Sequence, residues 1–444
     1  MTLDMTQGKP MKLLLRFAIP MMLSSLLQQM YTLCDSVIIG RLLGTVAFTA
    51  TSSAGNVNWF PLHILMGATQ GCGVALAQRF GAKNQEAFHR TFAGSMVLSL
   101  GVGILFSIVG LLYAKPFLVL LNTPDVLMDY ALRYLRILWA GFSITAILNI
   151  LGSALLATGD SRTPLIALAI SSGVNILLDL IFLAGFHWGV EGAALATVIA
   201  QISAALWSFR GLYKAEAILP KKSHFRLRKD TLKELLRLSL PRMLCNGVTT
   251  SGELLVQAAV NAWGVAFVTG LTASRRYLNL LNVINSGLEG SLVTYVGQNW
   301  GADKRDRIRQ GTHTAVRMGL VASVITGVSV YLLAGPMIRL FVPDGTEEAI
   351  RFGIEALQVQ AIFLPTLYWL CEYRAAIQGM GNSVIPMYSG FLELAMRIAC
   401  TLLLPLAIGQ KALYFTDAAA WVVTMAMLMI SYYSLQRKLL PRTP

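Results

Sequence analysis

The chain has 444 residues, of which 55% are hydrophobic and 13% are charged, and its formal net charge is +14. Soluble domains carry about 25% charged residues, so this composition excludes an ordinary soluble fold and indicates that lipid is the main solvent. The basic residues lie in the short gaps between apolar runs, where they orient a membrane chain. We therefore expect a lipid bilayer around the protein and no nucleic-acid partner.

Twelve apolar segments follow one another along the chain, and a span of a bilayer takes about 20 residues. They cover roughly residues 12–38, 48–78, 92–113, 129–157, 164–184, 190–212, 236–260, 266–296, 312–334, 348–377, 385–406 and 413–435. The first segment has no small-residue cleavage site, so we expect it to remain as a membrane span. The pattern predicts an all-α membrane protein with twelve transmembrane helices.

The charges in the gaps predict the orientation. Lys and Arg are abundant after the second, sixth and eighth segments and in the C-terminal tail, whereas the alternate gaps are poor in basic residues or acidic. By the positive-inside rule, both termini are expected to face the cytoplasm. An even number of spans agrees with this orientation.

The chain repeats itself at an offset of 221 or 222 residues. LLRFAIPMML (14–23) returns as LLRLSLPRML (235–244), and GDSRTP (159–164) is answered by GNSVIP (381–386). We predict two six-span lobes, 1–212 and 235–444, joined by a basic cytoplasmic linker, 213–234. Because six is even, both lobes enter the membrane from the same side, which predicts a pseudo-twofold axis along the membrane normal.

Pro20 and Pro241 lie at equivalent places in the two opening stretches. They predict either two ordinary helix kinks or a shared bend in the first helix of each lobe, and the sequence leaves both interpretations open. Two lobes with a cleft between them suit a transporter that alternates between inward-open and outward-open states. A channel or a receptor would leave the duplication unexplained.

An enzyme is not expected, because the chain contains no nucleophile–base pattern and no metal set such as H-E-x-x-H. The cysteines are not spaced as metal ligands and are expected to be buried thiols; they are Cys34, Cys72, Cys245, Cys371 and Cys400. No cofactor is predicted, and no metal is expected beyond a monovalent cation.

Ionisable residues within apolar spans are costly, so each is a candidate for function. Asp35 lies late in the first span, and Asp179 lies in the fifth span, four residues after Asn175. Two carboxylates close together in a low dielectric cannot both stay charged cheaply, so such a pocket suits a proton or a desolvated monovalent cation. Asp35 also lies about 35 Å along a straight helix from Lys12, near the outer interface, where an acid can simply be hydrated.

The second half carries its own polar set. The candidates for contact with a cation or a substrate are Glu253, Arg275, Glu289 and Glu372. Glu253 has no partner nearby in the sequence, and Glu372 is expected to pair with Arg374 or with a group on another helix. Glu393 and Arg397 are four residues apart and predict a salt bridge within one helix.

Several stretches in the same order resemble the multidrug and toxic compound extrusion (MATE) transporters. They are YTLCDSVIIGRLLG, AQRFGAKNQEAFHR, GDSRTP with NILLDLIFL, GVEGAALATVIAQ, TYVGQNWGADKRDRIR and QGMGNSVIP. The resemblance covers about residues 10 to 435 and is nearer to the DNA-damage-inducible branch. It implies a monomeric transporter in the bacterial plasma membrane that exports amphipathic, often cationic, organic compounds in exchange for Na⁺ or H⁺.

The resemblance also implies site residues. The cation site of the family's amino-terminal lobe falls on Asp35, Asn149, Asn175, Asp179 and Thr197. In the other main branch an acid on the seventh helix falls on Glu253, but the acid expected on the tenth helix is replaced by Thr366. Two alternatives to drug export remain: a flippase for lipid-linked sugars, which Arg275, Arg276 and Arg374 would suit, and an exporter of a metabolite.

Overall fold

The computed structural model describes residues 3–214, 220–343 and 345–439. Its α-helices are α1 (Pro10–Gly81), α2 (Gln85–Leu120), α3 (Asp125–Ala140), α4 (Phe142–Ala157), α5 (Arg162–Asp179), α6 (Gly189–Lys214), α7 (Lys229–Asn261), α8 (Val265–Gly301), α9 (Arg305–Phe341), α10 (Glu347–Gly379), α11 (Val384–Ile408) and α12 (Thr416–Leu439). Three short helical segments complete these ranges: η1 (Leu180–Gly185), η2 (Lys222–Phe225) and η3 (Gly409–Tyr414). Within the described ranges there is no strand, which confirms the all-α prediction.

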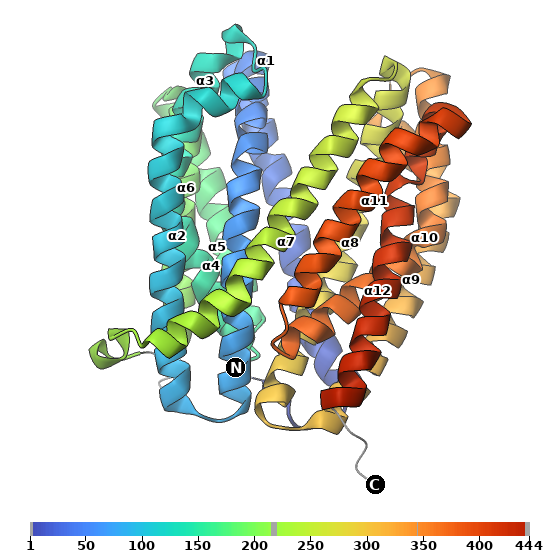
Figure 1. Ribbon diagram of the computed structural model, residues 1–444. Coiled ribbons are helices and arrows are strands. Elements are labelled where there is room, and N and C mark those ends of the chain that lie inside the picture. The colour runs from blue at the N-terminus through green and yellow to red at the C-terminus, as the bar shows by residue number, and fades with distance from the viewer. Residues whose placement is uncertain (1–2, 215–219, 344, 440–444) are drawn as a thin grey trace. The chain divides into compact units, whose positions relative to one another are not determined.

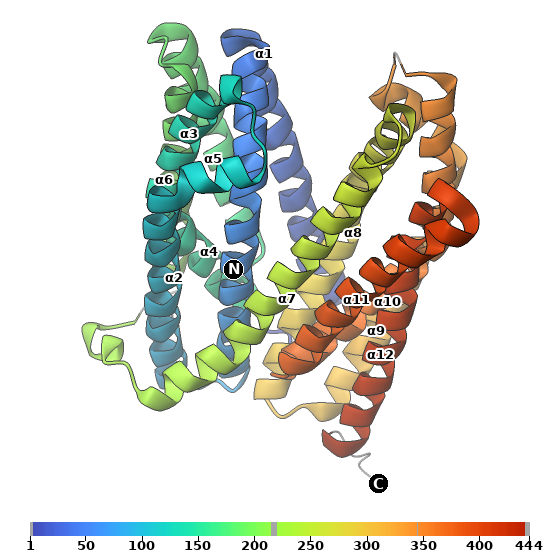
Figure 2. The ribbon, with the colours of Figure 1, turned by 45° about the horizontal axis from the view of Figure 1, so that its top comes forward.

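Helix α1 contains the first two predicted spans. Its 72 residues are interrupted at Gly44, whose φ of 85° and ψ of 177° are not helical. A positive φ is unfavourable for residues with a Cβ, so the glycine permits the chain to reverse there. Next to this reversal the two arms of α1 lie side by side in both views (Figures 1 and 2).

The other predicted spans map onto single helices or onto broken ones. The fourth span is the pair α3 and α4, which meet at an angle of 49°. The fifth is α5 continued by the π-helical turn η1. Among the described helices, α7 and α8 are too polar to be recognised as spans by hydropathy. Both hold ionisable residues within their apolar stretches, such as Glu253 in α7 and Arg275 in α8.

Contacts between residues divide the chain into two compact units. Unit 1 comprises residues 1–4 and 23–243, and unit 2 comprises residues 5–22 and 244–444. This division differs from the lobes expected at 1–212 and 235–444. The start of α1 belongs with the second half of the chain, and the start of α7 belongs with the first half. Residues 215–219 of the expected linker lie outside the described residues.

Small residues explain why the starts of these two helices are exchanged. In unit 1, a Cβ on Gly71 of α1 would lie 2.5 Å from the Cα of Ser239 in α7, and one on Gly67 would lie 2.8 Å from the Cα of Met243. In unit 2, a Cβ on Gly287 of α8 would lie 3.0 Å from the carbonyl oxygen of Ala18 in α1. Glycines spaced along a helix let two backbones approach closely in a membrane.

Each unit has its own apolar core. In unit 1 a core joins the second arm of α1 to α2, α3, α4 and α6, with Trp139 and Phe142 among its large side chains. In unit 2, one cluster joins α8, α9 and α10, and a second contains Phe267, Phe352 and Tyr414. These cores hold α1, α5 and α6 in unit 1, and α8 and α10 in unit 2, as supports for the polar groups described next.

Candidate functional site

The structure brings two acids of unit 1 together. Asp35, from the first arm of α1, and Asp179, the last residue of α5, lie close enough for their carboxyl groups to interact. Asp179 has no exposed surface. Apart from the two carboxyl groups themselves, no described residue offers a hydrogen bond to either carboxyl oxygen of Asp179 or to Oδ1 of Asp35. The sequence spacing left hydration of Asp35 open, and the structure instead encloses this oxygen.

Two of the predicted polar neighbours belong to the same cluster. Asn175 lies one turn before Asp179 on α5 and is fully buried. Its Nδ2 donates to Oγ1 of Thr197 on α6, at 3.5 Å, while Oδ1 of Asn175 is buried without a partner in the described residues. The cluster therefore presents carboxyl, amide and hydroxyl oxygens to one place, which are the ligands that hard cations prefer.

Asn149, another predicted residue of unit 1, makes a hydrogen bond within its own helix. Its Nδ2 donates to the carbonyl oxygen of Thr145 at 2.8 Å. The hydroxyl of Thr145 donates to Oε1 of Gln201 at 2.7 Å, which joins α4 to α6. Asn149 thus has a hydrogen bond that holds its own helix, and its inclusion in a cation site remains a prediction.

Two tyrosines also surround the acids. Tyr31, one turn before Asp35, interacts with Asp35, Asp179 and Thr197. Tyr134 of α3 is buried and interacts with the same three groups. Tyr31 shares a helix face with Asp35, because the two residues are four apart, whereas no spacing in the sequence connects Tyr134 with the acids. Its only signal was the strongly amphipathic pattern of α3, which predicts a buried face but not its neighbours.

The local backbone of α5 changes at the acid. The α-helix ends at Asp179, and the next six residues form the π-helical segment η1. The carbonyl oxygens of Ile181 and Phe182 accept hydrogen bonds from Phe186 and Trp188, which close the segment. Single π-helical turns within α-helices occur frequently at functional sites, and this one directly follows a candidate residue.

The predicted polar residues of unit 2 form two groups. Glu253 of α7 is exposed, and its charge interacts with Arg397 and Arg275. Nη1 of Arg275 donates to Oε1 of Gln257 on α7 at 2.7 Å, so α7 and α8 are tied together beside Glu253. Glu289 and Glu372, from α8 and α10, form the other group, in which the two acids interact with each other.

Glu372 does not pair with Arg374, which was one of its two expected partners. Arg374 instead pairs with Glu393 of α11, and both side chains are buried. Both carboxyl oxygens of Glu372 are buried without a hydrogen-bond partner among the described residues. Residues 372 and 374 are two apart on a helix, so their side chains point to different faces. The side chain of Arg374 thus reaches Glu393 of α11 and not Glu372.

The predicted salt bridge within α11 is present as part of a longer chain of charges. Nη1 of Arg397 lies 4.0 Å from Glu393, and Nε of Arg397 donates to Asp417 of α12 at 3.0 Å. Arg374, Glu393, Arg397 and Asp417 thus connect α10, α11 and α12. Since each charge has an opposite neighbour, this chain suits a structural role better than contact with a phosphate group.

The two prolines lie inside continuous helices. Pro20 is buried in α1, and Pro241 lies within α7. Each comes shortly before the residue at which its helix passes from one compact unit to the other, at 22–23 and at 243–244. A proline removes one backbone hydrogen bond from a helix, so both crossings occur where the helix is weakened. A role in bending remains a prediction for both.

The expectation of buried thiols is correct for four cysteines and wrong for Cys34, which is exposed. Cys34 lies on the face of α1 that also exposes Leu33 and Val37. Apolar runs in a lipid-facing helix need not be buried in protein, because the bilayer itself accepts apolar side chains.

Comparison with known proteins agrees with the duplicated helical fold. The family model MatE matches the chain twice, over residues 20–181 and 241–403. The probable multidrug resistance protein YpnP of Bacillus subtilis is 26% identical over 417 residues, which are 92% of each chain. The DNA damage-inducible protein F of Escherichia coli is 26% identical over 441 residues, covering 96% of this chain and 92% of that one.

A solved structure shows the same fold. It is described as the outward-facing conformation of a multidrug resistance MATE family transporter, and it has a TM-score of 0.92 at 22% identity, covering 99% of this chain and 98% of that chain. The protein described here is an all-α membrane protein with twelve spans in two lobes. The double match over most of its length shows that it belongs to the MatE family of multidrug efflux transporters.

Proposed function

We propose that the protein is a secondary-active antiporter that exports amphipathic, cationic organic compounds by alternating access, driven by an inward flow of H⁺ or Na⁺. The observation that carries this proposal is the pair Asp35 and Asp179, two acids held together in an apolar bundle, whose buried oxygens find no donor among the other described residues. Such a pair favours the uptake of one positive charge, because two adjacent carboxylates in a low dielectric repel each other. Each unit charge that moves inward supplies about 2.3 kcal/mol per 100 mV of membrane potential.

In this mechanism the acid pair loads a cation in one state and releases it in the other. The cation and the exported compound must each differ in affinity between the two states, or no coupling arises. Asn175 and Thr197 would supply neutral oxygens to a bound Na⁺, whereas H⁺ needs only a carboxyl group. The helices α1 and α7 cross between the compact units near Pro20 and Pro241, so bending there would couple the pair to the change of state.

The proposed location rests on the charges between the spans. We place the protein in the bacterial plasma membrane as a monomer, with both termini in the cytoplasm, on the distribution of basic residues between spans. No catalytic residues are assigned. An exporter of a metabolite would use the same acids with a different pocket. A flippase is less favoured, because Arg374, one of the arginines that would bind pyrophosphate, is paired with Glu393.

The test is transport of a fluorescent organic cation in inverted membrane vesicles, with a proton or a sodium gradient imposed separately. Asp179→Asn removes the charge and keeps the shape of the side chain, and we expect it to lower gradient-driven transport at least tenfold. Asp125→Asn, at the exposed start of α3, is the matched control and should behave as the unchanged protein. Undiminished transport by Asp179→Asn would refute the role of the pair, and transport without either gradient would refute antiport.

A further inference from the structure

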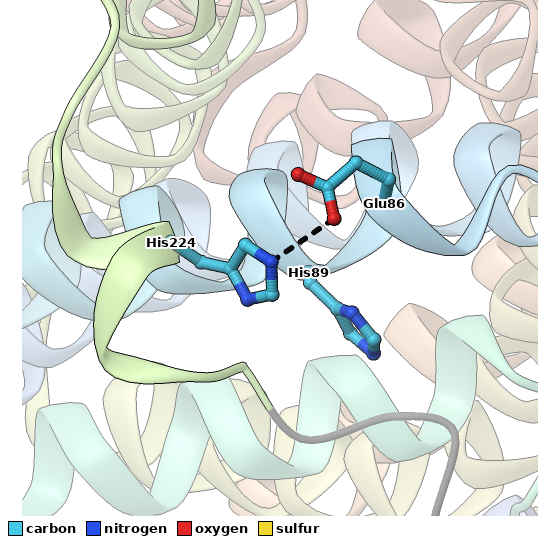
Figure 3. Close-up of side chains that lie close together, drawn as sticks. All are labelled: Glu86, His89 and His224. Carbon is cyan, nitrogen blue, oxygen red and sulfur yellow. Dashed lines mark hydrogen bonds and ion pairs between the residues drawn. The ribbon is translucent and has the colours of Figure 1, made fainter.

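Three side chains of types that can bind metal ions lie together at the start of α2, and they come from two distant parts of the chain. They are Glu86 and His89, which are three residues apart on α2, and His224, which lies in the short helix η2. Their candidate ligand atoms all lie within 4.8 Å of one another. Figure 3 shows the ring of His224 reaching from the linker segment toward the helix, with Glu86 and His89 beside it. All three residues belong to unit 1.

The position of His224 is unusual for a residue in a basic linker. Its side chain is only 8% exposed, although its neighbours Lys222 and Phe225 are exposed. Nε2 of His224 lies 3.0 Å from Oε2 of Glu86, and its ring centroid lies 5.1 Å from that of His89. The ring is thus fixed over α2 by two partners that are both potential metal ligands.

The carboxylate of Glu86 is oriented in the same way. Nε of Arg90 donates to its Oε1 at 2.7 Å, which leaves Oε2 directed toward His224. A second group that holds a ligand in place is a regular feature of metal sites in proteins. Arg90 also places a positive charge near the site, so a cation must bind through the nitrogen ligands and not through charge alone.

We propose that Glu86, His89 and His224 form a binding site for one divalent transition-metal cation such as Zn²⁺. Two imidazoles and one carboxylate are a ligand set that zinc uses in proteins, with a fourth position open to water. Imidazole ligands favour Zn²⁺, Ni²⁺ and Co²⁺ over Mg²⁺ and Ca²⁺, which prefer oxygen ligands. No spacing in the sequence connects His224 with Glu86 and His89, so this site was not predicted. The proposed metal site is independent of the proposed antiport.

The fit requires a small movement. With metal–ligand bonds of about 2.0–2.1 Å, the ligand atoms of a tetrahedral site lie about 3.4 Å apart. The ligand atoms here lie no more than 4.8 Å apart, so no separation must shrink by more than about 1.4 Å. Glu86 is exposed and η2 is a short segment on the surface of unit 1, so these groups can move without disturbing the apolar core.

Binding also changes which ring nitrogen of His224 carries the proton. The backbone N–H of Lys221 donates to Nδ1 at 2.8 Å, so the proton is on Nε2 in this arrangement. A neutral imidazole that binds metal through Nε2 carries its proton on Nδ1. The cation would replace the hydrogen at Nε2, the proton would transfer to Nδ1, and the N–H of Lys221 would turn to water. Metal binding therefore opens the turn at Lys221 while it fastens His224 to α2.

The experiment uses the full-length protein, purified in detergent with a tag that contains no histidine and freed of metal with a chelator. Co²⁺ is the probe, because its visible absorption becomes intense in a tetrahedral site, and Zn²⁺ is added to compete. We expect saturation at one equivalent, displacement by Zn²⁺, and an affinity at least tenfold lower in His89→Asn and in His224→Asn. His187→Asn is the matched control, because His187 is exposed and lies outside the cluster. Its φ of 57° is one that asparagine tolerates.

Each result of the Co²⁺ titration either supports or overturns the proposed metal site. Absence of saturable Co²⁺ binding by the unchanged protein overturns the proposal. So does an affinity for Co²⁺ in both histidine variants that equals the affinity of the unchanged protein. If His224→Asn fails to fold, His89→Asn and Glu86→Gln decide the question. Glu86→Gln keeps the size of the side chain and removes its charge, so it should weaken Co²⁺ binding while the protein still elutes as a folded species.

Discussion

At the scale of single residues, the interior of this protein shows two ways of placing charge in a low dielectric. In unit 1, Asp35 and Asp179 lie close together, and no described residue brings an opposite charge to them. In unit 2, Arg374, Glu393, Arg397 and Asp417 alternate in sign along α10, α11 and α12. Paired charges are stable as they stand, whereas two like charges are stable only when a cation or a proton joins them. The first arrangement therefore suits a switch and the second a support.

The buried pair of Arg374 and Glu393 gives a prediction about stability. Glu393→Leu leaves the guanidinium buried without its main partner, and such a loss costs about 3–5 kcal/mol of unfolding free energy. We expect a clear fall in thermal stability in detergent, measured by the loss of the monodisperse peak after heating. The double variant Arg374→Met with Glu393→Leu should be more stable than Glu393→Leu alone, because no unpaired charge remains.

The exposed pair of Arg133 and Glu191 is the control for that experiment. Surface ion pairs are screened by water and contribute little, so Glu191→Leu should change the stability only slightly. Equal losses from Glu393→Leu and Glu191→Leu would contradict the structural role assigned to the buried pair.

At the scale of helices, close packing depends on glycines at a few contacts. The Cβ of a residue at Gly110 of α2 would lie 2.1 Å from the indole of Trp139 in α3. That indole cannot easily move, since its Nε1 donates to Oδ1 of Asn58 on α1 at 2.9 Å. The absent side chain at residue 110 thus allows three helices to meet.

Alanine at residue 110 should therefore lower the stability of the protein, although alanine favours a helix more than glycine does. We expect Gly110→Ala to lower thermal stability, because α2 and α3 must separate or the hydrogen bond of Trp139 must break. Gly101→Ala, in the same helix but with open space around it, should be neutral or stabilising by up to about 1 kcal/mol. Heating of both variants in detergent tests the contrast, and equal behaviour of the two would contradict it.

At the scale of the whole molecule, the chain exchanges the first segments of its two halves. Residues 5–22 belong to unit 2, where the N–H of Met5 donates to Oε1 of Gln298 at 2.8 Å. Arg307 of α9 donates to the carbonyl oxygens of Met5 and Gly8 at 3.2 and 2.9 Å. The N-terminal segment is thereby tied to helices almost 300 residues away in the sequence.

Removal of the Arg307 side chain should release this segment. In Arg307→Met the carbonyl oxygen of Gly8 loses its donor and that of Met5 keeps only Nδ2 of Asn299, at 3.1 Å. We expect faster amide hydrogen exchange over residues 5–9, measured by mass spectrometry. Arg317→Met, which alters an exposed residue of the same helix, controls for the loss of a basic side chain. Exchange over residues 5–9 at the rate of the unchanged protein in Arg307→Met would show that other contacts suffice.

Some of these features could be predicted because they depend on local or repeated patterns. The lengths of the apolar runs fixed the twelve spans, and the repeat at an offset of 221 indicated two halves, which the double match of the family model reproduces. Asp179 and Asn175 could be grouped because residues four apart share a face of a helix. The expectation that Asp35 and Asp179 lie together rested on their being acids within apolar spans and on the resemblance, since 144 residues separate them and spacing says nothing across that distance.

Other features were decided only by the tertiary structure. The partner of Arg374, the approach of Tyr134 to the acids, the exchange of the first segments of the two halves and the meeting of His224 with α2 all join residues that are far apart in the chain. Their positions depend on which helix faces pack together, and in a membrane that choice rests on small residues such as Gly71 and Gly110, because lipid does not drive apolar faces inward. The sequence by itself determined the spans and their duplication, because the thickness of a bilayer sets the length of a helix. The pairing of charges needed the folded chain.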